Sequence, residues 1–181
     1  MRAGRLRYRA TLLALGDQLQ VVELGQRWVD IRTKEGDSPA PAGLRQRSLV
    51  EIRSRFSDIF RSGRYLQHGG RLFHLVSPRP VGNGAELVVS AEELAGEPGQ
   101  YIPQGGGPLC CRVHLTHEAP YRDELGQVTS YMTRAEVAII EVGRPQEGDQ
   151  LRVSGVPYVV AHYADESDDG VVRGLWLLPV E

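Results

Sequence analysis

Polar and apolar residues alternate one by one along most of this chain, and apolar residues at helical spacing are almost absent. Over residues 5–12 the apolar positions are Leu6, Tyr8, Ala10 and Leu12, separated by arginine or threonine. A period of two places successive side chains on opposite faces of a strand, so this segment predicts one apolar face and one cationic face. The pattern therefore indicates strands and not helices.

The first 90 residues hold six or seven such segments, separated by glycine, proline or polar turns. The predicted strands cover residues 5–12, 18–24, 27–32, 50–56, 64–67, 71–76 and 86–89. Glycines between 64–67 and 71–76 allow the positive φ of a hairpin turn, so these two segments should pair. We expect Gly25 to join two strands, and Pro78 and Pro80 to end the strand before them. This many short strands predicts a small barrel or sandwich.

The rest of the chain repeats this organisation after a segment rich in glycine and proline. Residues 90–93 have capping-box spacing and allow one helical turn, and residues 96–108 predict a linker. The later strands are expected over residues 109–116, 136–142, 150–153, 158–163 and 171–178. The predicted fold is all-β, with two small antiparallel β-barrel or β-sandwich domains in tandem, at 1–95 and 109–181.

Two segments without a regular pattern are expected to be loops. The first consists of Gly36, Asp37, Ser38, Pro39, Ala40, Pro41, Ala42 and Gly43. The second covers residues 117–134, where Tyr121, Tyr131 and Met132 are apolar groups that gain from a partner surface. Covering of their own sheet is the alternative, and it is stronger for Tyr121 than for Tyr131.

The net charge of −2 hides a strong difference between the two halves of the 181 residues. Residues 1–79 carry 15 Lys and Arg against 7 Asp and Glu, whereas residues 96–181 carry 6 against 13. A basic first half suits DNA, an acidic protein surface, or merely solvent. No apolar run approaches the roughly 20 residues of a membrane helix, and no apolar segment follows the basic start, so we expect a soluble protein without a secretory signal or membrane partner.

Residues with catalytic or metal-binding chemistry are scattered, so no enzyme, cofactor or metal is expected. His114 and His117 are three apart, which places them on opposite faces of a strand and argues against a shared zinc ion. Cys110 and Cys111 also alternate, so one suits the core and the other the surface. The acidic segment 165–170 resembles part of a calcium loop, but Trp176 occupies the position of the essential glutamate.

The first 90 residues resemble the phage head-tail joining family of head-closure, or stopper, proteins. The resemblance lies in Gly4-Arg5-Leu6-Arg7-Tyr8-Arg9, Arg27-Trp28-Val29-Asp30-Ile31, Val50-Glu51-Ile52-Arg53, Gly63-Arg64-Tyr65-Leu66, Gly69-Gly70-Arg71-Leu72-Phe73-His74-Leu75 and Glu86-Leu87-Val88-Val89. Val29 departs from the family, whose members often have alanine there, and the segment between Leu15 and Trp28 is short.

The last 70 residues resemble a second neck protein, the lambda-type head-tail joining protein. Here the resemblance lies in Glu136-Val137-Ala138-Ile139-Ile140, Gly148-Asp149-Gln150-Leu151-Arg152-Val153, Pro157-Tyr158-Val159-Val160, and Gly170 with Leu175-Trp176-Leu177-Leu178. Both resemblances point to the same part of a tailed phage.

Together the resemblances imply a structural protein of the virion neck, assembled in the host cytoplasm as a sixfold or twelvefold ring. Its implied neighbours are a portal or adaptor protein on one side and a tail terminator or tail tube protein on the other. Double-stranded DNA would pass through the lumen without sequence recognition, and the loop Ser38–Gly43 would face it. Two alternatives stay open: a tail terminator or tail-completion protein, and a nucleic-acid-binding β-barrel acting alone.

The residues expected at subunit or partner interfaces are cationic in the first half and apolar in the second. They are Arg5, Arg7, Arg9, Arg45, Arg47, Arg53, Arg55, Tyr121, Tyr131 and Met132. Since a strongly positive lumen would hold DNA back, we expect many arginines to lie at protein interfaces instead.

Overall fold

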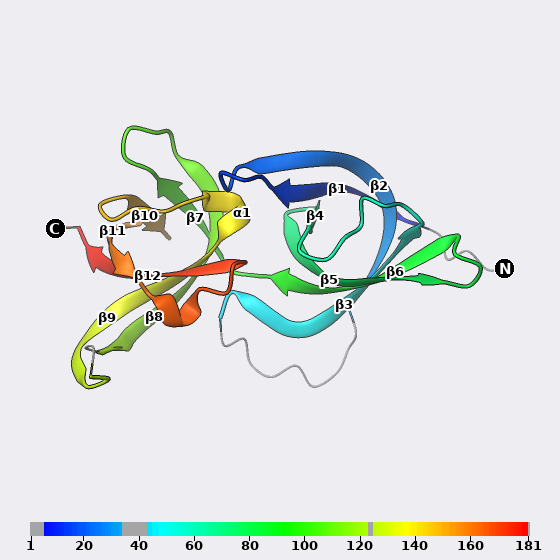
Figure 1. The fold of residues 1–181 in the computed structure, drawn as a ribbon. Coiled ribbons are helices and arrows are strands. Elements are labelled where there is room, and N and C mark those ends of the chain that lie inside the picture. Colours follow the sequence, from blue (N-terminus) through cyan, green and yellow to red (C-terminus); the bar gives the residue numbers. More distant parts are fainter. Residues whose placement is uncertain (1–5, 34–42, 123–124, 181) are drawn as a thin grey trace. The chain divides into compact units, whose positions relative to one another are not determined.

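The computed structural model describes residues 6–33, 43–122 and 125–180, without the side chains of residues 46–49 and 167. The chain divides into two compact units, Met1–Ala95 and Gly96–Glu181 (Figure 1). Each unit is a closed antiparallel barrel of six strands, which confirms the predicted all-β tandem fold. Within the described residues, no helix has the length and hydropathy needed to cross a bilayer.

The first unit closes its barrel in the strand order β1-β2-β3-β6-β5-β4. Its strands are Tyr8–Leu15 (β1), Val21–Thr33 (β2), Arg45–Arg55 (β3), Tyr65–His68 (β4), Arg71–Val81 (β5) and Glu86–Leu94 (β6). The alternation seen in the sequence fills the barrel, since Ala10 and Leu12 are buried against Ile52 and Phe73 in one apolar cluster. The expected hairpin of β4 and β5 is present, with His68 opposite Arg71.

Three details of the first unit differ from the sequence-based expectation. Gly25 does not separate two strands: with a φ of 114° it lies at a bulge inside β2, opposite Leu12. Pro78 and Pro80 do not end β5, because beyond Leu75, whose N–H still donates to Arg64, this strand pairs only with β6 and needs no N–H groups on its other side. Residues 90–93 continue β6 and form no helical turn.

The second unit closes its barrel in the order β10-β11-β12-β9-β8-β7. Its elements are Glu97–Ile102 (β7), Leu109–Arg122 (β8), Val128–Ala138 (β9), Ile139–Val142 (α1), Gln150–Val153 (β10), Val156–Tyr163 (β11), Asp165–Ser167 (η1) and Val172–Pro179 (β12). Val113, Val137, Leu151 and Leu175 are fully buried in its core.

The predicted linker 96–108 is wrong in its first half, because residues 97–102 form β7 of the second barrel. Gly99 explains this: a Cβ at that position would lie 2.7 Å from Cγ2 of Val113 and 3.2 Å from the carbonyl oxygen of Arg152. Glycine therefore lets β7 approach its neighbours β8 and β10 closely. The strand expected over residues 136–142 ends earlier, at Ala138, because α1 follows it directly.

Candidate interaction surfaces

The outer surface of the first barrel carries a tryptophan between two arginines. Arg9 of β1 is the register partner of Trp28 in β2. Val29 pairs with Ser54, so the next position brings Trp28 beside Arg55 of β3. The inward neighbours Val29 and Ser54 are buried, whereas 56% of Trp28 is exposed. We call Arg9, Trp28 and Arg55 the tryptophan row.

The predicted interface arginines divide into paired and unpaired groups. Nε of Arg53 donates to Glu51 at 2.7 Å, and Nε of Arg45 lies 3.1 Å from Glu92. The hydrogen bond and the charge of Glu51 raise the pKa of Arg53 above its ordinary value. Arg7, Arg9 and Arg55 are exposed, and their side chains make no ion pair with another described residue.

Other predicted residues of the first unit lie wholly or partly outside the described chain. Arg5 and residues 36–42 of the expected lumen loop belong to the undescribed segments. The backbone of Arg47 is in β3, but its side chain is not described. Gly43, the last residue of that loop, is buried in a bend two residues before β3.

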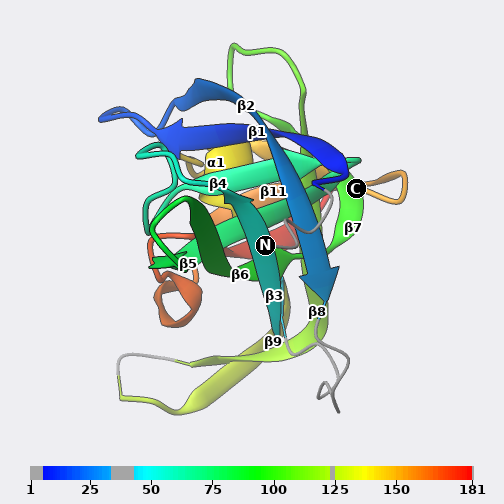
Figure 2. The same cartoon turned by 90° about the vertical axis from the view of Figure 1, so that its right-hand side faces the viewer.

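Residues 117–134, expected to be a loop, instead extend the hairpin of β8 and β9 beyond the barrel. β7 pairs with β8 only as far as Val113, and β12 pairs with β9 only from Thr133 onwards. Among the described strands, residues 119–122 and 128–132 therefore pair with each other and with no third strand (Figures 1 and 2). We call residues 117–122 and 125–132 the arm.

A bulge at the base of the arm directs part of it back over the barrel. The register between β8 and β9 shifts between Thr116 and Ala119, and Glu118 has a φ of 53°. Beyond this bulge the ring of Tyr121 lies 5.3 Å from that of Trp176 in an edge-to-face arrangement. Bulges commonly re-aim side chains in this way.

The three predicted apolar residues of the arm have different surroundings. Tyr121 packs on Trp176 of its own barrel, as the alternative interpretation held. Tyr131 is 69% exposed, and Met132 is half-buried beside it. A two-stranded ribbon alone is marginally stable in water, so the exposed face of Tyr131 suits a contact with another molecule.

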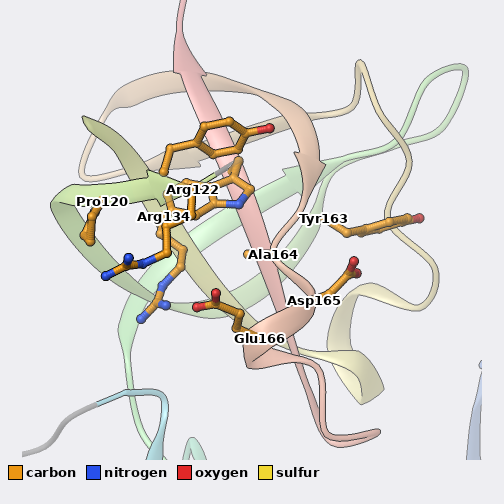
Figure 3. A pocket seen from close by; sticks show the side chains of 9 residues that line it. Pro120, Arg122, Arg134, Tyr163, Ala164, Asp165 and Glu166 are labelled. Carbon is orange, nitrogen blue, oxygen red and sulfur yellow. The ribbon is translucent and has the colours of Figure 1, made fainter. Parts of the chain in front are cut away.

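A pocket of about 230 Å³ lies between the arm and the segment around η1 (Figure 3). Arg122 of β8 and Arg134 of β9 line one side, and Asp165 and Glu166 of η1 line another. The aromatic part is formed by Tyr121, Tyr163 and Trp176, with Pro120 and Ala164 completing the lining. A cavity of this size accepts one or two amino-acid side chains.

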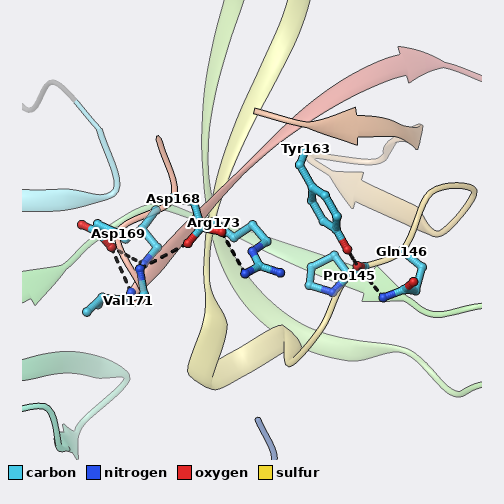
Figure 4. Close-up of polar contacts among 9 residues, drawn as sticks. Pro145, Gln146, Tyr163, Asp168, Asp169, Val171 and Arg173 are labelled. Carbon is cyan, nitrogen blue, oxygen red and sulfur yellow. Dashed lines mark hydrogen bonds and ion pairs between the residues drawn. The ribbon is translucent and has the colours of Figure 1, made fainter. Parts of the chain in front are cut away.

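The four acidic residues around η1 are used in two different ways, and Figure 4 shows the contacts of Asp168 and Asp169. Asp168 lies 2.8 Å from Nη2 of Arg173, and Asp169 accepts hydrogen bonds from the backbone N–H groups of Val171 and Val172. The carboxylates of Asp165 and Glu166 make no hydrogen bond or ion pair with another described residue. The first pair thus stabilises the turn, and the second faces the pocket unpaired.

The position of Tyr163 in the pocket wall is fixed by two further contacts. Its hydroxyl donates to the carbonyl oxygen of Pro145, and the guanidinium carbon of Arg173 lies 5.1 Å from its ring centroid (Figure 4). The same Pro145 oxygen accepts from Nε2 of Gln146 at 2.9 Å. The pocket is therefore built on side chains that other parts of the second unit hold in place.

A buried polar cluster holds the loop before β10 to the end of β7. Asp149 is 1% exposed, and its carboxylate accepts hydrogen bonds from the hydroxyl of Tyr101 and the backbone N–H groups of Gln104 and Gln146. Burial and the hydrogen bond with Asp149 raise the pKa of Tyr101. Because all three donors bind one buried carboxylate, we infer that this cluster stabilises the fold of the second unit.

The two cysteines differ in burial, and the described cysteines and histidines form no group suited to a metal ion. Cys110 is exposed and Cys111 is buried, as the alternation predicts. Burial, with the nearby charge of Glu141, raises the pKa of the Cys111 thiol to about 12. No group of three or more His, Cys, Asp or Glu suited to a metal ion occurs among the described residues.

Sequence reasoning missed both Trp28 and the charged pocket. Trp28 follows from the strand pattern, because its position next to Val29 in an alternating strand places the two side chains on opposite faces. The pocket is lined by residues 120–122, 134, 163–166 and 176. These residues come together because of the bulge in β8, and their spacing in the sequence does not predict it.

Comparison with known proteins places the second unit in a phage family. A family model described as phage head-tail attachment protein matches residues 84–179, more than half of the chain and the whole span from β6 to β12. The chain has no significant match among curated proteins or among solved structures. The match confirms a head-tail joining family for the C-terminal part, while the resemblance of the first unit to stopper proteins stays a prediction. The chain therefore belongs to the phage head-tail attachment protein family.

Proposed function

We propose that this protein is a structural component of the neck of a tailed phage, where it joins the DNA-filled head to the tail. The observation that carries the proposal is the match of residues 84–179 to head-tail attachment proteins, which spans the complete second barrel. The proposed neighbours are a portal or adaptor protein and a tail terminator or tail tube protein. The protein would act as a closed sixfold or twelvefold ring whose lumen lets double-stranded DNA pass.

The construction of the two units supports this role. Closed barrels satisfy the hydrogen bonds of their own strands, so contacts with neighbours fall to outward side chains and to the arm. The tryptophan row and the exposed Tyr131 supply such contacts in different units. Ring subunits need different surfaces for their neighbours, because contacts around a ring are heterologous.

The pairing of arginines in the first unit also suits a protein through which DNA moves. Arg32, Arg45, Arg53 and Arg71 each lie within ion-pair distance of Asp30, Glu92, Glu51 and Glu93, respectively. Pairing lowers the positive potential of the barrel surface. A lumen of low net charge retards DNA less than one lined by free arginines, because phosphate contacts dominate DNA affinity.

The test is deletion of the gene followed by electron microscopy of the lysate. A neck role predicts DNA-filled heads and finished tails lying separately, with almost no joined particles. Intact virions in the lysate would reject the role. Unjoined tails of irregular length would point instead to tail termination.

A further inference from the structure

The tryptophan row and the charged pocket beside the arm have complementary chemistry. We propose that the row of one copy docks into the pocket of a second copy, with Trp28 meeting the aromatic wall at Trp176 and Arg55 meeting Glu166. This inference rests on the proposed ring and names the contact that joins its subunits.

The tryptophan row has the composition of a protein-binding surface. Trp28 exposes 56% of its area on a barrel surface, with exposed arginines on both sides. Tryptophan and arginine are the residues that most often dominate the binding energy of protein interfaces. A surface that bound the phosphates of DNA would use the arginines, but it would gain nothing from a large indole beside them.

The pocket supplies the groups that this row lacks. Asp165 and Glu166 are exposed carboxylates without a partner among the described residues, and Trp176 lies in the same lining. A guanidinium between a carboxylate and an aromatic face gains both a charged hydrogen bond and a cation–π contact. About 230 Å³ provides room for one or two side chains of an incoming surface.

The order of charges agrees on the two surfaces. In the first unit, Arg55 is followed across the sheet by its register partner Glu86. In the pocket, the acidic side at Glu166 is accompanied by a basic side at Arg122 and Arg134. The row with the neighbouring Glu86 of β6 therefore offers a positive group for the acidic side of the pocket and a negative group for its basic side.

The overall charge and symmetry favour a second copy as the occupant. Residues 1–79 carry 15 Lys and Arg against 7 Asp and Glu, and residues 96–181 carry 6 against 13. Row and pocket are different surfaces of the same chain, so their contact is heterologous and closes into a ring when the rotation fits. An isologous dimer through the row would instead place arginines against arginines.

Charge reversal with rescue tests the contact inside the assembled particle. Arg55→Glu and Glu166→Arg are introduced singly and together into the gene, and infectious titre is measured with virion morphology. Each single variant should lower the titre by about tenfold or more, because it places like charges in contact, and the double variant should restore most of the loss. Arg61→Glu and Glu147→Arg reverse exposed charges outside the two surfaces and should leave the titre nearly unchanged.

Cross-linking identifies the partner as a second copy. Purified virions carry Arg55→Cys and Glu166→Cys together with Cys110→Ser, which removes the exposed native thiol, and are treated with a short bis-maleimide. A ladder of multiples of the 20.0 kDa chain is expected. Either cysteine alone should give no ladder.

The possible outcomes separate this inference from the proposed function. If deletion blocks head-tail joining but both single reversals assemble normally, the row–pocket contact is overturned while the neck role stands. Failure of the double variant to recover, or cross-links that leave the chain at monomer mass, also overturns the contact. Joined virions after deletion reject the neck role itself.

Discussion

Tyr121 of the arm lies edge-to-face on Trp176 of the barrel, with ring centroids 5.3 Å apart and planes at 82°. This pair holds the arm, whose two strands pair with each other and with no other described strand, to the surface of β12. Aromatic pairs of this geometry add about 0.5–1.5 kcal/mol beyond the area they bury. The contact therefore sets the position of the arm and one wall of the charged pocket.

Removing this contact should loosen the arm without unfolding the barrel. We expect Tyr121→Ala to raise amide hydrogen exchange in residues 119–132 by about 2- to 10-fold, the range that corresponds to an aromatic pair. Exchange of β10 and β11 should stay unchanged. Tyr131→Ala is the matched control, because Tyr131 is 69% exposed; equal exchange in both variants would show that Tyr121 does not hold the arm.

Removing the buried carboxylate should destabilise the second unit strongly. Asp149→Ala leaves the hydroxyl of Tyr101 and the N–H groups of Gln104 and Gln146 without their acceptor, at a cost of about 3 kcal/mol or more. Tyr101→Phe removes one donor and should cost about 1–2 kcal/mol.

Urea unfolding followed by tryptophan fluorescence measures these losses. The chain has two tryptophans, so a Trp28→Phe background leaves Trp176 as the reporter of the second unit. Glu97→Gln is the control: among the described residues its carboxylate accepts only the exposed hydrogen bond from Ser154, and the change should cost less than about 0.5 kcal/mol. A loss for Asp149→Ala no larger than that of the control would contradict the role of the cluster.

Adding one methyl group at Gly99 should test the close approach of β7. In Gly99→Ala the new Cβ meets Cγ2 of Val113 at 2.7 Å and the Arg152 carbonyl oxygen at 3.2 Å, so we expect a loss of about 1–3 kcal/mol in the same assay. Gly107→Ala has nothing within 4 Å of its new Cβ and should be nearly neutral. Equal stability of the two variants would refute the packing explanation for β7.

The two neighbouring thiols should react at very different rates. At pH 8 a maleimide should label one thiol per native chain, at Cys110, because Cys111 is buried and its pKa is raised to about 12. Cys110→Ser should abolish the fast labelling, whereas two fast thiols in the native chain would be inconsistent with the buried position.

The raised pKa of Cys111 also fixes the direction of its pH effect. The folded state keeps the proton, so this contribution to stability is complete below the ordinary thiol pKa and is lost as the pH rises from there toward about 12. Urea midpoints measured at increasing alkaline pH should fall less for Cys111→Ala than for the unmodified chain. An equal fall of the urea midpoint in both proteins would show that Cys111 does not contribute to the pH dependence of stability.

The sequence predicted strands well where alternation was strict and turns were short. Residues 150–153 form β10 with the expected bounds, and the hairpin of β4 and β5 turns at the expected glycines. A period of two reports directly which side chains enter a barrel, as Ala10 and Leu12 do.

Other features depended on neighbours in space. The Gly- and Pro-rich segment 97–102 becomes a strand because β8 and β10 lie on its two sides and accept a glycine at close range. Phe56, the last residue of the strand expected over residues 50–56, is 56% exposed, and β3 ends one residue before it. The pocket requires the bulge at Glu118, and the sequence does not predict the positive φ of this glutamate.

The most direct test of the neck role is in vitro complementation. Purified protein is added to a lysate in which the gene is deleted, and infectious particles are counted before and after. We predict a rise of several orders of magnitude together with joined particles in the microscope. No rise, from a lysate whose heads and tails both join when the gene is supplied during infection, would contradict the account.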